Sequence, residues 1–375
     1  MSSRHLLFFV TEDWYFVSHR LGLAIAARHM GMDVTVVTRI REHGDVIARA
    51  GIRVIPFEIA RSGTNPLREI VTLARLIQLY RRERPDVVHH VAMKPVLYGA
   101  LAARATGVHR QVNALAGMGW LFTSKSGVAR AIKPFVRGAL RLALRGGVAL
   151  VQNPDDEEML VQIGVARSQV RRIAGSGIDL NQYQVQDEAP GCLVVVLPSR
   201  LLWDKGVGEF VSAARELKAR GSTARFVLAG EPDAQNPATV PTEQIQAWVT
   251  EGVVEHLGWV TNMPALLAAS HVVCLPSYRE GLPRSLLEAA AAGRAIVTTD
   301  VPGCRELVTD GENGLLVPAR DAHALALAIE RLVTDADLRA ACGARNRKRA
   351  ENEFASEVVI PQTLALYEGH SSTCG

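Results

Sequence analysis

The chain has 375 residues, of which 48% are hydrophobic and 21% charged, a composition typical of globular proteins, and its length favours two domains. No apolar run approaches the ~20 residues that a membrane-spanning helix requires. The five cysteines lack Cys-x-x-Cys spacing and so indicate neither a zinc site nor a disulfide framework; a reducing cytoplasm fits best.

The net charge of +4 conceals two halves of opposite sign. Residues 1–150 contain 22 Lys+Arg against 9 Asp+Glu, a balance of +13, and the remaining residues contain 20 against 29, a balance of −9. Between Val87 and Pro154 there are nine basic residues and no acidic one. A region of one sign this long predicts an anionic partner, for which nucleic acid, a phospholipid surface and a pyrophosphate substrate all qualify.

Short apolar runs alternate with amphipathic stretches along the first half. The stretch "RLGLAIAARHMG" at 20–31 has helical spacing and ends at a glycine cap. Buried strands are predicted at 5–10, 33–38, 53–57, 86–91, 110–115 and 148–153. Strands that alternate with helices predict a parallel sheet with helices on both faces.

The same pattern restarts after the polar stretch at 181–191, which is the predicted linker. Strands are predicted at 193–199, 225–230, 253–258, 271–277 and 295–300, and Asn313-Gly314 is a turn signal. We therefore predict two Rossmann-like domains facing a cleft, over residues 1–182 and 191–354. Ligands of such domains bind at the carboxyl ends of the strands. A dinucleotide-dependent enzyme is an alternative with little support, because "TEDWYFVSHR" after the first strand contains no glycine.

The segment "SYREGLPRSLLEAAAAGRAIV" at 277–297 places two carboxylates around the start of a helix. Pro283 suits a helix start, Gly281 lets a ligand approach the main chain, and the turn Gly281-Leu282-Pro283 offers backbone N–H groups to an anion. Glu280 and Glu288 suit the hydroxyls of a sugar and of a ribose, respectively. Taken alone, Glu288 is equally explained by an i,i+4 surface pair with Arg284.

A second motif, "PSRLLWDKGVGEF" at 198–210, also follows a predicted strand. It presents Arg200 and Lys205 in a loop closed by Gly206, an arrangement that suits a diphosphate. Taken singly, each cation is explained equally well as a solvated charge in a loop. The only Asp-x-Asp, at Asp335 and Asp337, lies among helical residues and is interpreted as helix surface.

Together these two motifs resemble the retaining, nucleotide-sugar-dependent glycosyltransferases of the GT-B fold, family four. Within that family the chain is most similar to bacterial α-1,3-N-acetylgalactosaminyltransferases acting on polyprenyl-diphosphate-linked sugars, on the segments "FVSHRLGLAIAA", "KPVLYGALAA" and "ALAGMGWLF". The chain departs from many members in lacking their glycine-rich loop after the first strand, and from some in lacking a histidine in "NALAGMGW".

The resemblance implies transfer of a sugar, an N-acetylhexosamine by expectation, from a nucleotide sugar, UDP favoured, to a lipid-diphosphate-linked saccharide in surface polysaccharide, O-antigen or exopolysaccharide assembly. It makes Arg200, Lys205 and Glu280 the catalytic candidates and Gly281, Leu282, Pro283 and Glu288 donor-binding. The cations would stabilise the leaving diphosphate, so no metal or other cofactor is expected. The last helix, at 355–369 around Pro361, is expected to pack back on the first domain.

Candidates for the acceptor side are His19 and Arg20 after the first-strand loop, and Lys94 and Asn113 at strand ends. A helix-end role is equally open for His19, and His89 and His90 suit a core role better than catalysis.

The basic region also contains a helical stripe of five residues. At 100° per residue they fall within about 120° of one face, with Phe135, Ala139, Leu142 and Ala143 on the opposite, packing side. The five are Arg130, Lys133, Arg137, Arg141 and Arg145. With the aromatic segments at 14–16 and 119–122, the stripe predicts peripheral binding to the anionic inner face of the cell membrane. A merely solvated basic face is the alternative.

Three other functions stay open at this stage. A glycosyltransferase with a soluble acceptor, or a nucleotide-sugar epimerase of the same fold, would share the donor motifs. A nucleic-acid-binding module would explain the basic half but not the paired glutamates, and no nucleic-acid motif is present, so no nucleic-acid partner is expected.

Overall fold

The computed structural model describes residues 3–59, 66–115 and 127–368, and these residues form two compact units. The first comprises the chain up to Gly177 together with helix α15 (Ser356–Glu368), and the second runs from Ile178 to Ala355. The sequence predicted that the first domain ends at residue 182, which is five residues after Gly177. The residues predicted as a linker instead pack in the second unit, where Glu188 accepts two hydrogen bonds from Arg339, at 2.6 and 2.7 Å.

Seven parallel strands form the sheet of the first unit, in the order β3-β2-β1-β4-β5-β6-β7. Six of them were predicted; β7 was missed because it is only three residues long, two of them arginines. The strands are β1 (His5–Glu12), β2 (Asp33–Arg39), β3 (Arg53–Pro56), β4 (Val87–Val91), β5 (Arg110–Ala114), β6 (Val148–Val151) and β7 (Val170–Arg172).

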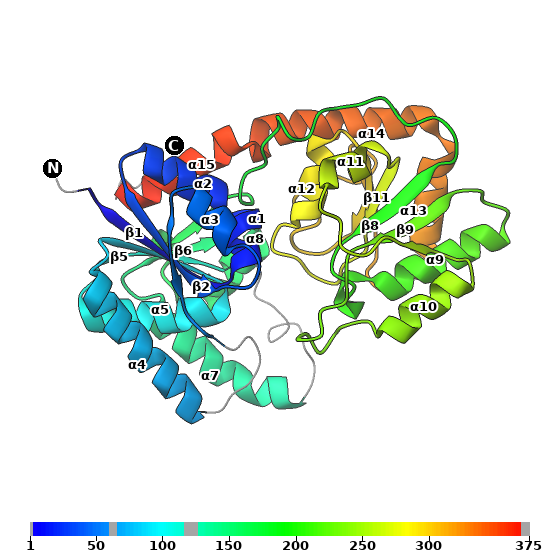
Figure 1. Ribbon diagram of the computed structural model, residues 1–375. Helices are drawn as coiled ribbons and strands as arrows, with labels where there is room; N and C mark the ends of the chain where they lie inside the picture. Colours follow the sequence, from blue (N-terminus) through cyan, green and yellow to red (C-terminus); the bar gives the residue numbers. More distant parts are fainter. Residues whose placement is uncertain (1–2, 60–65, 116–126, 369–375) are drawn as a thin grey trace. The chain divides into compact units, whose positions relative to one another are not determined.

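Helices cover both faces of this sheet (Figure 1). Alternate residues of β1 point to opposite faces, so Phe8 packs toward α1, α2 and α15, whereas Phe9 packs toward α4 and α5. These helices and the others of the unit are α1 (Asp13–His19), α2 (Leu21–His29), α3 (Gly44–Arg49), α4 (Pro66–Glu83), α5 (Met93–Thr106), α7 (Gly127–Ala143), α8 (Pro154–Gln162) and the short η1 (Arg167–Gln169).

The second unit repeats the architecture with six parallel strands in the order β10-β9-β8-β11-β12-β13. The predicted strand at 253–258 shrinks to two residues, and β13, which follows the predicted turn, was not predicted. The strands are β8 (Val194–Pro198), β9 (Arg225–Ala229), β10 (Glu255–His256), β11 (Val272–Leu275), β12 (Ala295–Thr299) and β13 (Gly314–Val317). The predicted α/β class is therefore confirmed in both halves.

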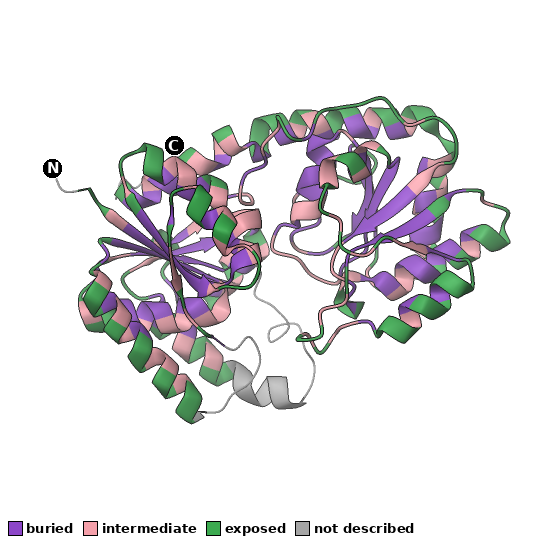
Figure 2. Cartoon of the chain, in the orientation of Figure 1, coloured by how far each residue is buried: buried purple, intermediate pink, exposed green. Residues whose placement is uncertain are grey.

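The helices of the second unit also lie on both sides of their sheet, and its strands are almost entirely buried (Figure 2). They are η2 (Trp203–Lys205), α9 (Val207–Ala219), α10 (Thr242–Thr250), α11 (Met263–Ala268), α12 (Arg284–Ala291), α13 (Ala322–Thr334), α14 (Ala336–Arg349) and η3 (Ala350–Phe354). Among the described residues of either unit, no helix is long and apolar enough to cross a membrane.

Glycines allow the loops at the carboxyl edge of the second sheet to pack backbone against backbone. Gly206, between η2 and α9, has φ +73°, and a Cβ there would lie 2.1 Å from the carbonyl oxygen of Pro276. At Gly230 and Gly303 an added Cβ would likewise meet backbone, 1.9 Å from the Ser199 oxygen and 2.6 Å from the Gly281 oxygen. The loops after β8, β9, β11 and β12 therefore form one close-packed layer.

We predict that Gly206→Ala lowers the free energy of unfolding of the second unit by about 2 kcal/mol or more, because overpacking adds to the cost of a positive φ. Gly221→Ala is the matched control, since Gly221 has φ +91° but open space around its Cβ position. It should cost only about 1 kcal/mol. Urea unfolding followed by circular dichroism measures both, and equal losses would contradict the packing argument.

Candidate functional site

Lys205 and Glu280, predicted from separate motifs, meet at the carboxyl edge of the second sheet. Lys205 ends η2, after β8, and Glu280 lies in the loop after β11, the neighbouring strand. Their ion pair joins Nζ to Oε1 at 2.5 Å, and both side chains are largely buried. The chain order of the sheet reverses between β8 and β11, which is where ligands bind in open α/β sheets.

The Glu280 carboxylate is held by a second donor that the sequence did not reveal. The hydroxyl of Ser277 donates to the same Oε1 atom at 2.6 Å, and Ser277 is fully buried. Its carbonyl oxygen accepts a hydrogen bond from the Thr299 hydroxyl. Burial and then the Glu280 charge raise the pKa of the nearby Cys304 thiol to about 12. Glu280 is therefore fixed through Oε1.

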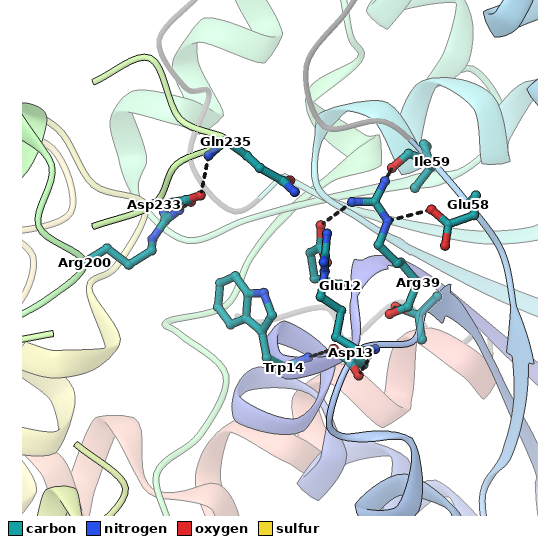
Figure 3. A network of polar contacts seen from close by, with 11 residues as sticks. Glu12, Asp13, Trp14, Arg39, Glu58, Ile59, Arg200, Asp233 and Gln235 are labelled. Carbon is teal, nitrogen blue, oxygen red and sulfur yellow. Dashed lines mark hydrogen bonds and ion pairs between the residues drawn. The ribbon is translucent and has the colours of Figure 1, made fainter. Parts of the chain in front are cut away.

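Arg200 lies in the same layer of loops but pairs with a carboxylate. Its Nη1 donates to Oδ2 of Asp233 at 2.6 Å, and the backbone N–H of Gln235 donates to the other oxygen at 3.2 Å (Figure 3). Asp233 was not among the predicted residues, because nothing in "EPDAQNPATV" marks one acid as functional. The guanidinium has five N–H donors, of which the Nη1 group makes this contact.

Helix α12 begins one residue later than predicted, with Pro283 as the N-cap. Leu282 is buried beside it. Inside the helix, Nε of Arg284 donates to Glu288 at 2.8 Å, so the expected i,i+4 pair exists. It is not a simple surface pair, because Glu288 is only 8% exposed and also interacts with the buried Tyr183. Burial and the Glu288 charge raise the pKa of Tyr183 far above its ordinary value.

The acceptor-side candidates of the first unit lie in different environments. His19 ends α1, and its Nδ1 shares a hydrogen bond with the hydroxyl of Ser18. Arg20 is buried, and its Nη1 donates a hydrogen bond to the carbonyl oxygen of His19. Lys94, in the first turn of α5, donates to Glu69 at 2.9 Å. Burial acts to raise the pKa of Glu69. Hydrogen bonds from Tyr98 and Lys94, together with the Lys94 charge, outweigh burial, so the pKa of Glu69 is lowered overall.

Asn113 is better explained as a core residue than as an acceptor contact. It is fully buried, its Oδ1 bonds to Nδ1 of His90 at 2.7 Å, and Nε2 of His90 bonds to Tyr80 at 3.0 Å. Burial lowers the pKa of His90 to about 4, so the ring is neutral at physiological pH. The structure thus corrects the placement of Asn113, and the core role expected for His90 fits its surroundings.

The basic stripe lies on α7 and, for Arg145, in the turn that follows it. Its described residues are exposed: Arg137, Arg141 and Arg145 all face solvent. The side chains of Arg130 and Lys133, like the segment 119–122, fall outside the described residues. The apolar side was predicted wrongly for two residues. Phe135 is 80% and Leu142 46% exposed, and the residues that pack inward are Val136, Leu140, Ala143 and Leu144. The arc of exposed residues therefore contains both charge and large apolar groups.

Within the described residues, no group of three or more His, Cys, Asp or Glu side chains could hold a metal ion. Asp335 instead caps α14, accepting the Leu338 N–H at 2.9 Å. This agrees with its interpretation as part of a helix end.

Two family models match the chain. Residues 5–150 match "Glycosyl transferase 4-like" and residues 192–335 match "Glycosyl transferases group 1", so each α/β unit carries one match. The chain belongs to the GT-B glycosyltransferases.

Relatives and solved structures are similar to the glycosyltransferase over most of its length. It is 26% identical, over 93% of its length and 94% of the relative's, to the Campylobacter jejuni N,N'-diacetylbacillosaminyl-diphospho-undecaprenol alpha-1,3-N-acetylgalactosaminyltransferase. It is 24% identical, over 72% of both chains, to the Escherichia coli UDP-Gal:alpha-D-GlcNAc-diphosphoundecaprenol alpha-1,3-galactosyltransferase. Anabaena HepE, solved with UDP and glucose, has the same fold, with a TM-score of 0.80, 19% identity and coverage of 97% and 99%.

This family membership selects a transferase among the functions that the sequence left open. An epimerase, a dinucleotide-dependent enzyme and a nucleic-acid module are thereby set aside. The identity of the acceptor is a separate question.

We predict that Ser277→Ala lowers kcat/KM of the glycosyltransferase about tenfold, which corresponds to about 1.4 kcal/mol, because Oε1 of Glu280 loses a charge-assisted hydrogen bond. In a Glu280→Ala background the same change should cost less than twofold. Ser270→Ala is the matched control, because Ser270 is another buried serine of this unit whose hydroxyl bonds only to the backbone, at the Leu266 oxygen. Additive losses in the double mutant would contradict positioning through Glu280.

Proposed function

We propose that this glycosyltransferase moves an N-acetylhexosamine, with retention of anomeric configuration, from a UDP-sugar to a saccharide carried on a lipid diphosphate. The observation that carries the proposal is the pairing of Lys205 with Glu280 at the edge of the second sheet, with Arg200 in the same layer of loops. The names of the two relatives with lipid-diphosphate acceptors and the UDP bound to Anabaena HepE support the substrate classes.

In this reaction the bond between the anomeric carbon and the diphosphate oxygen breaks as the acceptor hydroxyl oxygen forms the new glycosidic bond. Negative charge then develops on the leaving UDP. The Lys205 ammonium has three N–H donors, of which one binds Glu280, so two are available for phosphate oxygens. The α12 N-terminus beyond Pro283 adds the positive end of a helix dipole. Both effects act most strongly in the transition state.

Glu280 would orient the donor sugar while the charge develops. Because Ser277 and Lys205 both bind Oε1, the geometry leaves Oε2 to accept a sugar hydroxyl. Glu288, held between Arg284 and Tyr183, suits the ribose diol. The acceptor proton leaves with the product phosphate, so the step balances without a separate general base.

The function is tested by supplying UDP-GalNAc and UDP-GlcNAc, in turn, with a synthetic undecaprenyl-diphosphate saccharide. We expect a glycolipid product with an α linkage, read by NMR, because the donor is α-linked to UDP. We also expect full activity in excess EDTA, since the cations do the work of a metal. A β linkage would contradict retention, loss restored by magnesium would contradict metal independence, and transfer only to soluble saccharides would contradict the lipid acceptor.

We further propose that α7 places the first unit on the anionic inner face of the cell membrane. Its exposed face combines Arg137 and Arg141 with the exposed Phe135 and Leu142, and Arg145 is exposed in the turn after the helix. Helices that lie in a membrane interface combine charge and apolar groups in this way. Helix α4 covers the same face of the sheet (Figure 1) and exposes Leu67, Ile70 and Val71. The aromatic segment 14–16 contributes less than predicted, because Phe16 is buried.

Changing Arg137, Arg141 and Arg145 to Glu should abolish binding to vesicles that contain phosphatidylglycerol and raise the KM for the lipid acceptor. Affinity for UDP should not change, because α7 lies outside the second unit. The control has the same charge change on exposed residues of the second unit: Lys218, Arg331 and Lys348 to Glu. Equal vesicle binding by the two triple mutants in a sedimentation assay would contradict the membrane proposal.

A further inference from the structure

A carboxylate of this chain already pairs with Arg200, the guanidinium that the proposed function assigns to the donor diphosphate. Nη1 of Arg200 donates to Oδ2 of Asp233 at 2.6 Å, which is short even for a charge-assisted hydrogen bond. The Asp233 side chain is 13% exposed, and the Arg200 side chain is 34% exposed. A phosphate that binds this guanidinium from the accessible side therefore lies close to a second negative charge.

The loop after β9 holds the Asp233 carboxylate in place. The backbone N–H of Asp233 donates to the Thr239 hydroxyl at 2.9 Å, and its carbonyl oxygen accepts the N–H of Asn236 at 2.8 Å. Its Oδ1 atom accepts the N–H of Gln235 at 3.2 Å (Figure 3). Oδ1 thus bonds to its own loop, while Oδ2 faces Arg200.

Backbone hydrogen bonds also tie this loop to the one that carries Arg200. The N–H of Leu201, the residue after Arg200, donates to the carbonyl oxygen of Glu231 at 2.9 Å. The carbonyl oxygen of Leu201 accepts the N–H of Val240, also at 2.9 Å. These bonds lie before and after Asp233 in the chain. The carboxylate is therefore held against Arg200 by the framework of two loops and not by the ion pair alone.

A fixed carboxylate at this place has two opposite effects on an anionic ligand. It orients the guanidinium before the ligand arrives, which favours binding. It also repels phosphate oxygens, and this repulsion is stronger in a partly buried layer than in water. The second effect matters most for the product, because UDP keeps the diphosphate of the donor after the sugar has left. Residues that hold the donor also hold UDP, and slow product release limits the turnover of many enzymes.

We propose that Asp233 is a positioning residue that competes with the diphosphate for Arg200 and so limits how tightly UDP is held after transfer. The inference rests on the proposed function in one respect, which is that Arg200 binds the diphosphate. It predicts that removal of the Asp233 charge increases the affinity for UDP. A merely structural role for Asp233 predicts the reverse, because a damaged loop loses affinity.

The test measures the Kd for UDP and for uridine by isothermal titration calorimetry on the full-length enzyme. Asp233→Asn keeps the size of the side chain and an oxygen acceptor but removes the charge. It should lower the Kd for UDP about tenfold, since a like charge at this distance is only partly screened. The Kd for uridine, which has no phosphate, should not change. In steady-state assays, the donor KM and kcat of this variant should both fall, because release of UDP becomes slower.

Two control variants separate this effect from a general change of charge. Asp233→Glu keeps the charge and should not lower the Kd for UDP. Glu255→Gln removes the same charge from the ion pair with Arg225, at the opposite end of β9. It should leave both Kd values within about twofold, because this exposed pair lies beyond the reach of unscreened interaction.

Arg200→Ala distinguishes failure of this inference from failure of the proposed function. Loss of UDP affinity in Arg200→Ala, together with unchanged or weaker UDP binding in Asp233→Asn, would overturn the role of Asp233 and leave the diphosphate site standing. Unchanged UDP affinity in Arg200→Ala would contradict both. Tighter UDP binding by Asp233→Asn in an enzyme that uses no lipid acceptor would support the role of Asp233, although the proposed acceptor would then be wrong.

Discussion

The carbonyl of Pro276 occupies the space that a side chain at residue 206 would need, and the layer of loops in the second unit depends on this close approach. Only a glycine with positive φ lets the loop after β8 pack against the loop after β11. That packing brings Lys205 to Glu280, although 75 residues separate them in the chain. The ion pair, the Ser277 hydrogen bond and the start of α12 are then fixed relative to one another.

The same layer of loops balances its charges in advance. Lys205 is paired with Glu280 and Arg200 with Asp233, so a carboxylate orients each of the two cations. Each pairing reduces the cost of holding a positive charge in this partly buried layer. Preorganised charge of this kind stabilises a transition state without reorganisation during the reaction.

In the first unit, the buried polar side chain of His90 belongs to the framework. His90 is enclosed by Tyr80, Asn113 and Gly99, where an added Cβ would lie 2.3 Å from the imidazole, and its low pKa follows from that enclosure. The exposed face of α7 differs in that its described charged side chains are accessible to solvent.

Local pattern was sufficient for most of the fold and for locating the two loops that meet at the edge of the second sheet. Apolar runs flanked by helical spacing identify strands such as β1 and β8, because a strand buried on both faces must be apolar along its whole length. The pattern failed for β7 and β13, which are short and hold their places by pairing with β6 and β12. Lys205 and Glu280 were found because each lies in a recognisable loop at the end of a strand.

Contacts between distant segments were decided only by the tertiary structure. Sequence spacing could not show that Asp233 binds Arg200, that Tyr183 interacts with Glu288, or that Ser277 and Lys205 share one oxygen of Glu280. It also assigned Phe135 to the packed side of α7, because helical periodicity gives the angle between residues but not which arc the neighbouring helix covers. The sequence by itself determined the class of fold and identified the loops that hold Lys205 and Glu280. Burial and pairing, which depend on what each element packs against, required the folded chain.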